Sequence, residues 1–128
     1  MLRVAFLLFL LPAFDLADTT FRPPELHNTP TIEGMILSAA IRNGIDPELV
    51  LRLAWRESNL RSDVVGHNRG SIDSGVMQLN SRAVPGAEQM STRENIDAGV
   101  SILAMWLERC RGNRHCAIEA YGRGHIRK

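Results

Sequence analysis

The sequence predicts a mainly α-helical protein that folds as one small domain. Its 128 residues, 45% of them apolar, suit a single hydrophobic core. Apolar residues recur at helical spacing in several segments, whereas no strand-like alternation extends beyond a few residues. The net charge is only +1 and no long run carries one sign, so the composition favours no nucleic-acid partner.

The first 17 residues differ in kind from the rest. Arg3 gives a positive start, residues 4–14 are an apolar run, and a polar segment follows Ala17, an order typical of a secretory signal. A membrane-spanning helix needs ~20 apolar residues, so the run is too short to span a bilayer. Asp15 stands where a small residue usually precedes cleavage, which leaves an uncleaved anchor or an earlier cut open. Either way, we expect an exported protein of the periplasm, the cell envelope or a phage virion.

The remaining chain divides into a connector, a domain and a tail. Residues 18–30 hold three prolines and no apolar period, which predicts a connector. Residues 31–125 carry the helical patterns, and residues 126–128 are a short basic tail.

Two helices are predicted at the start of the domain. The first begins near Thr31 and ends at Asn43 and Gly44, a pair that supplies a left-handed stop. The second begins at Asp46 and Pro47, because the Asp side chain can accept from first-turn N–H groups and Pro suits the first helical position. A short loop between them predicts a helical hairpin.

The second helix carries a carboxylate on its apolar stripe. Val50, Leu53, Ala54 and Glu57 fall at i, i+3, i+4 and i+7. In one interpretation Glu57 turns to solvent or pairs with a nearby Arg. In the other, an apolar wall raises its pKa toward neutrality and makes it a proton donor.

The second half of the domain is predicted from loop residues and a helix cap. Residues 61–75 hold three glycines and no regular period, so we expect a loop that lines a site. Ser91 and Glu94 form a capping box, and a helical period follows as far as Cys110. Trp106 on this helix is most simply a core residue, and a last short helix follows Cys116.

Cys110 and Cys116 predict one disulfide, since the chain carries an export signal. Two reduced thiols are the alternative. Zinc is disfavoured because only His115 lies close by and the spacing of a structural zinc site is absent. We expect no metal and no cofactor.

Four motifs follow one another along the domain: residues 54–60 (AWRESNL), 75–80 (GVMQLN), 94–99 (ENIDAG) and 120–124 (AYGRG). In order and spacing they resemble the lytic transglycosylases of the goose-lysozyme-like, soluble (SLT) superfamily. The loop HNRGSIDSG looks most like the specialised branch that accompanies type III and type IV secretion, conjugation and some phage particles. The resemblance covers residues 31–125 and implies a small lysozyme-like domain.

The resemblance implies an activity and one catalytic residue. Family members cleave the β-1,4 bond between N-acetylmuramic acid and N-acetylglucosamine in peptidoglycan and leave a 1,6-anhydromuramoyl end. Glu57 matches their general acid and base. One carboxylate suffices on that scheme, since the acetamido group and then the C6 hydroxyl of the substrate attack. A hydrolytic lysozyme would need a second group, for which Asp73 is the first candidate; its more common role would be a local turn.

The resemblance also implies roles for five further residues. Ser58 would touch the substrate near the scissile sugar, or merely bond back to its own helix. Gln78 would contact acetamido groups and Met77 would form an apolar wall of the cleft. Asn95 would bind sugar, unless it is only a first-turn residue. Tyr121 would donate a hydrogen bond to the catalytic carboxylate.

One departure from the family pattern opens an alternative. The family usually has Asn where this chain has Gly122, a change that could weaken binding or mark a degenerate enzyme. The competing hypothesis is therefore a scaffold module that grips glycan strands without cutting them. Because the chain has no wall-binding repeat, we expect a secretion, conjugation or phage-infection complex to position it for local wall opening. A monomer is the default.

Overall fold

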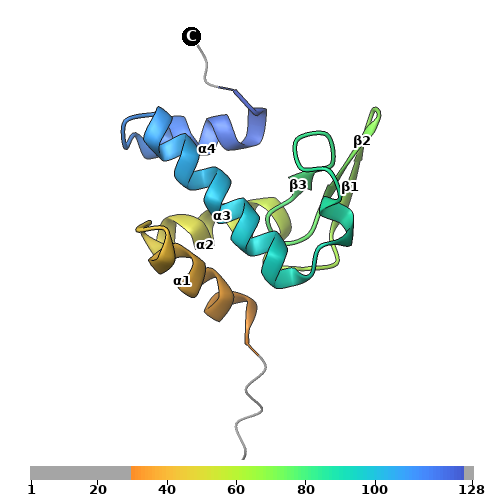
Figure 1. Cartoon of the computed structure of the whole chain (residues 1–128), viewed down its shortest axis with the longest axis horizontal. Helices are drawn as coiled ribbons and strands as arrows, with labels where there is room; N and C mark the ends of the chain where they lie inside the picture. The colour runs from red at the N-terminus through yellow and green to blue at the C-terminus, as the bar shows by residue number, and fades with distance from the viewer. Residues whose placement is uncertain (1–29, 126–128) are drawn as a thin grey trace, which may run out of the picture.

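The computed structural model describes residues 30–125, which form a mainly helical single domain with a small sheet (Figure 1). The long helix α3 crosses the middle of the molecule, packed against α1 and α4, and the sheet lies to one side. The predicted fold class is confirmed. In chain order the elements are α1 (Ile32–Arg42), α2 (Pro47–Ser58), β1 (Val65–Asn68), β2 (Ser71–Ser74), β3 (Leu79–Asn80), the 3₁₀ turn η1 (Ala87–Gln89), α3 (Thr92–Arg109) and α4 (Arg114–Arg123).

The helix starts and stops follow the predicted local signals. The side chain of Thr31 accepts a hydrogen bond from the N–H of Gly34 at 3.0 Å, and Asp46 caps α2 in the same way. Gly44 has a φ of 64°, the left-handed conformation expected between α1 and α2. Ser91 and Glu94 form the predicted capping box at the start of α3.

The core lies between the helices. The apolar stripe of α2 is buried as predicted, and Trp106 on α3 is 7% exposed, which confirms it as a core residue. The predicted disulfide is also present: Cys110 and Cys116 join the end of α3 to α4, with their Cα atoms 5.9 Å apart. It therefore constrains the turn that directs α4 back along α3.

The prediction that residues 61–75 form only a loop is wrong. β1 and β2 pair antiparallel around a turn at Gly70, where φ is 77°, and β3 pairs with β2 on the other side. The strands have at most four residues and are mainly polar, so they carry no apolar alternation from which to predict them. Backbone pairing and polar side chains stabilise this hairpin in place of a buried face.

The expected signal at residues 1–17, most of the connector at 18–30 and the basic tail at 126–128 lie outside the described residues. Between residues 30 and 125, no helix has the length and apolar character needed to cross a membrane.

Candidate active site

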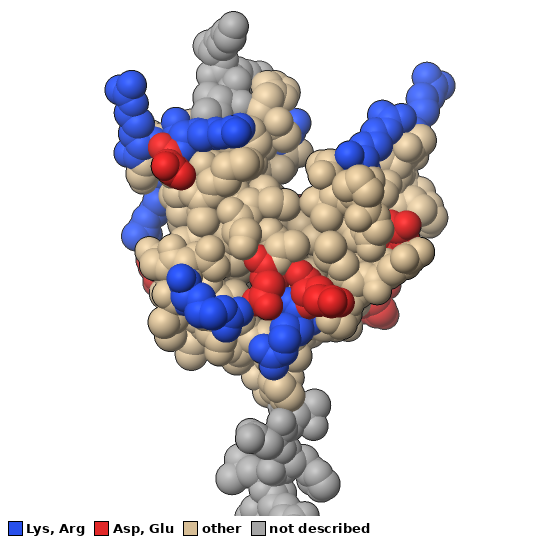
Figure 2. Space-filling view, in the orientation of Figure 1, with Lys and Arg blue, Asp and Glu red and all other residues tan. Residues whose placement is uncertain are grey.

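A cleft of about 960 Å³ lies between the helices and the sheet. Figure 2 shows the surface hollowed between these two parts of the molecule. One wall comes from α3 and α4, the other from the sheet and the segment after β3, and the end of α2 contributes Glu57. The lining residues are Glu57, Asn68, Ser71, Asp73, Gln78, Leu79, Asn80, Arg82, Ala83, Val84, Ile102, Met105, Trp106, Tyr121, Gly122, Arg123 and Gly124.

Glu57 lies in the last turn of α2, at the edge of this cleft. Its side chain is 20% exposed, and its Oε1 accepts hydrogen bonds from Arg56, at 3.2 Å from Nε and 2.8 Å from Nη2. Glu57 therefore pairs with an arginine, as in the first interpretation, and it also lines the cleft. A carboxylate in such a position can exchange a proton with a bound ligand.

Ser58 is buried and points away from solvent. Its hydroxyl lies 2.7 Å from the carbonyl oxygen of Val76 and 3.2 Å from that of Ala54, both of which accept. The first bond ties α2 to residues 74–78, which we call the cleft loop. The second is the back-bond to its own helix that was the alternative interpretation of this serine.

Asn95, on α3, fastens the same loop from the opposite side. It is 2% exposed; its Oδ1 accepts from the N–H of Met77, and its Nδ2 donates to the carbonyl of Ser74, both at 2.9 Å. Gly75 permits this approach, since a Cβ on it would lie 2.5 Å from the Asn95 amide nitrogen. Both ends of the amide therefore serve the protein backbone.

Tyr121, on α4, supplies a third fastening. Its hydroxyl donates to the carbonyl of Met77 at 2.7 Å, rather than to Glu57 as the resemblance implied. Burial, and secondarily the nearby charge of Glu57, hold the pKa of the phenol well above its usual value, so the phenol stays protonated as a donor. A buried carbonyl left without a donor would be costly, which explains why the hydroxyl bonds there.

Met77 and Gln78, the two middle residues of the motif at positions 75–80, have different surroundings. Met77 is fully buried and packs against Gly99 of α3, so its side chain lies in the core and not on the cleft wall where we expected it. Gln78 does line the cleft, and its Nε2 donates to the carbonyls of Val64 at 3.0 Å and Gly75 at 2.9 Å. Its φ of 47° marks the sharp bend into β3.

Asp73 lies in β2, inside the sheet and not in a turn, and it lines the cleft. Its Oδ1 accepts from the amide of Asn80 at 2.8 Å, and its Oδ2 accepts from that of Asn68. The carboxylate therefore links the three strands. Sequence reasoning missed both asparagines, because their separations of five and seven residues from Asp73 give no periodic signal.

Arginines of the cleft were also missed. Arg82 donates to the carbonyls of Gly70 at 3.1 Å and Arg69 at 3.2 Å and so holds the tip of the hairpin, while Arg123 pairs with Glu119. Their presence gives the cleft both basic and acidic groups, which suits a polar ligand.

Comparison with known families gives one match. The family model for the Transglycosylase SLT domain matches residues 34–128. The chain belongs to this family. Comparison of this chain with curated proteins and with solved structures found no match. In this SLT domain the matched range contains Glu57, the cleft loop and the three side chains that fasten that loop.

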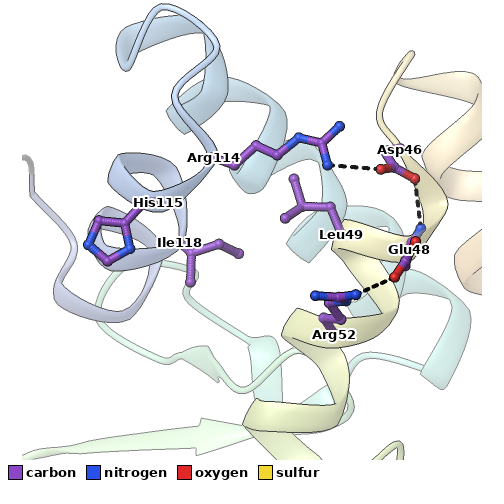
Figure 3. A pocket seen from close by; sticks show the side chains of 7 residues that line it. All are labelled: Asp46, Glu48, Leu49, Arg52, Arg114, His115 and Ile118. Atoms are coloured by element: carbon purple, nitrogen blue, oxygen red, sulfur yellow. Dashed lines mark hydrogen bonds and ion pairs between the residues drawn. The ribbon is translucent and has the colours of Figure 1, made fainter.

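A second cavity of the SLT domain, about 340 Å³, lies at the other end of α2 (Figure 3). Its charged groups face one another: Arg114 pairs with Asp46 at 3.0 Å, and Arg52 pairs with Glu48. Because these charges are already neutralised in pairs, we assign no ligand to this cavity. Among residues 30–125, no cluster of three or more His, Cys, Asp or Glu side chains is arranged to hold a metal ion.

Proposed function

We propose that this protein is a peptidoglycan lytic transglycosylase in which Glu57 is the general acid and then the general base. The observation that carries the proposal is that Glu57 lines a cleft of about 960 Å³ in an SLT domain. A volume of about 960 Å³ is at the upper end of ordinary ligand pockets, as a site for several sugar rings requires.

The proposed reaction needs one carboxyl group. Protonated Glu57 gives its proton to the glycosidic oxygen, and the bond to C1 of N-acetylmuramic acid breaks as the acetamido oxygen of the same sugar attacks C1. The carboxylate then takes the proton of the C6 hydroxyl, whose oxygen displaces the acetamido oxygen. The products are an anhydro end and a free hydroxyl on the leaving sugar, and Glu57 is protonated again.

A hydrolytic lysozyme is the second candidate, and one observation favours it: Asp73 lines the same cleft as Glu57. Water activation would require a free lone pair on this carboxylate. Each oxygen of Asp73 accepts one hydrogen bond from an asparagine amide and keeps a second lone pair, so these bonds orient the carboxylate in the sheet without blocking a water.

Location and partners belong to the same proposal. The order of charge and apolar residues in positions 1–17 supports export, and a wall substrate would be met in the periplasm or envelope, or from a virion. The likeness of residues 67–75 to the specialised branch supports action within a secretion, conjugation or phage-infection complex.

Digestion of purified peptidoglycan by the full chain and by Glu57→Gln tests the proposal, with the new sugar ends identified by mass spectrometry. Glu48→Gln, which alters an exposed glutamate of the same helix, is the matched control. We expect anhydro-ended fragments from the parent and the control but none from Glu57→Gln. Reducing ends that disappear in Asp73→Asn would establish the lysozyme instead. Glycan binding without fragments from any of the proteins would establish the scaffold module.

A further inference from the structure

The arginine beside the proposed acid makes contacts in two directions. The guanidinium of Arg56 donates twice to Oε1 of Glu57, and its Nη2 also reaches the carbonyl of Ile118 on α4 at 3.5 Å. Arg56 does not line the cleft, although its side chain is 46% exposed. Its closest contact with the cleft is therefore its ion pair with Glu57, which does line the cleft.

Glycine at position 122 gives this guanidinium its space. Gly122 lies inside α4, and its φ is not positive, so the backbone does not require glycine there. Glycine is also a poor helix residue. A Cβ added at 122 would lie 3.5 Å from Nη2 of Arg56, which is ordinary contact, and no other group outside α4 lies within 4 Å of that point, so a longer side chain directed the same way would compete with the guanidinium for space.

We propose that Arg56 is a positioning residue for the catalytic carboxylate, and that Gly122 is what admits it. This inference rests on the proposed function and deepens it. Two N–H groups on Oε1 fix the orientation of the carboxyl group and leave Oε2 as the oxygen that carries the transferable proton. The reach to α4 anchors the guanidinium to the helix that forms the adjoining wall of the cleft.

Kinetics on soluble glycan strands test the role. Arg56→Met removes every donor, and we expect kcat to fall by about ten- to a hundredfold, as misorientation of a reacting group can do, with KM changed less than about twofold. Arg56→Lys, which keeps a positive charge with N–H donors but loses the planar guanidinium, should recover part of kcat. The control is Arg52→Met, one turn earlier on α2, where the arginine pairs only with an exposed glutamate.

Substitutions at position 122 test whether the guanidinium of Arg56 needs the space that glycine leaves there. Gly122→Asn extends a side chain across the guanidinium and should lower kcat about as much as Arg56→Met, and the double variant should be no slower than the slower single one. Gly122→Ala adds only a Cβ at ordinary contact distance, so the ion pair of Arg56 and Glu57 should persist in it and its kcat should stay above that of Gly122→Asn. Additive losses in the double variant, or equal kcat in Arg56→Met and the parent, would overturn the proposal.

A readout that does not require activity separates this inference from the proposed function. In ¹⁵N-labelled protein the Nε–H signal of Arg56 should be distinct in the parent and in Gly122→Ala, and should collapse into the exposed-arginine signals in Glu57→Gln and Gly122→Asn. An unchanged signal in both of the latter variants would refute the ion pair even in an active enzyme. An inactive parent with the expected signals would reject the proposed function and leave the ion pair standing.

Discussion

Alkaline pH should destabilise this protein through one side chain. Tyr121 is the chain's only tyrosine, and burial raises its pKa above the value of about 10 that it has when unfolded. The unfolded state therefore releases the phenolic proton more readily than the folded state. The contribution of Tyr121 to the free energy of unfolding is fully present below about pH 10. Above that pH it decreases by up to about 1.4 kcal/mol for each pH unit.

Few other groups titrate in that range, which makes the effect measurable. Lysine occurs only at Lys128, the arginines stay charged, and both cysteines are in the disulfide. We would measure urea unfolding from about pH 8 to about pH 11.5 for the parent and for Tyr121→Phe, and follow tyrosinate absorbance in the folded parent. Tyr121→Phe loses a hydrogen bond to a buried carbonyl and should be less stable at neutral pH by about 1–3 kcal/mol, yet its stability should change little with pH above 10.

Two results would refute this reasoning. Equal alkaline slopes for the two proteins would mean that the phenol is not the group responsible. Tyrosinate absorbance that appears near pH 10 in the still-folded parent would mean that the hydroxyl is accessible to solvent, and that its bond to the cleft loop does not persist.

Three further predictions concern packing, the cleft loop and the disulfide. Gly99→Ala would put a Cβ 2.4 Å from that of Met77, so the clash should outweigh the helix propensity gained and lower the unfolding free energy by about 2 kcal/mol; a stability equal to the parent's in urea would contradict this. Asn95→Ala leaves two buried backbone groups of the cleft loop unpaired and should lower the unfolding free energy by about 3 kcal/mol in the same assay. If the variant lost only its affinity for sugar, Asn95 would be a ligand residue. Reducing the Cys110–Cys116 disulfide should cost about 2 kcal/mol, the value for so short a loop, and a double Cys→Ala variant should be insensitive to the reductant.

The helices were predictable because their signals are local. Asp46 with Pro47 and the pair Ser91 and Glu94 each act within one turn, so a few adjacent residues define where a helix begins. The burial of Val50 follows from its spacing to neighbours on the same helix. Such features depend little on the rest of the fold.

The hairpin was not predictable because its stabilising contacts are mostly between polar groups on different strands. The glycine, serine and isoleucine residues next to Asp73 in the sequence predict that Asp73 lies in a loop. Only the paired strands bring it to Asn68 and Asn80, whose amides satisfy its two oxygens. The partners of this carboxylate are seven or fewer positions away, but they lie on other strands, beyond a turn. Such contacts produce no regular spacing of residue types from which a strand could be predicted.

The site residues illustrate a limit of a different kind. Ser58 and Asn95 were expected to touch the glycan, and Tyr121 to bond the catalytic carboxylate. Each bonds a backbone group of the cleft loop, from α2, α3 and α4 respectively. Hydroxyls and amides can serve a sugar or a peptide group equally well, so their spacing cannot distinguish the two roles. The loop carries the buried Met77 at its centre and has no regular pairing of its own there, so its shape depends on these three donors and acceptors. A loop fastened to three helices keeps a fixed position relative to Glu57, at the end of the first of them. Replacing any fastener should therefore disturb the cleft and the acid together, which would look like loss of a substrate contact in an activity assay, and only the unfolding free energy would reveal the difference.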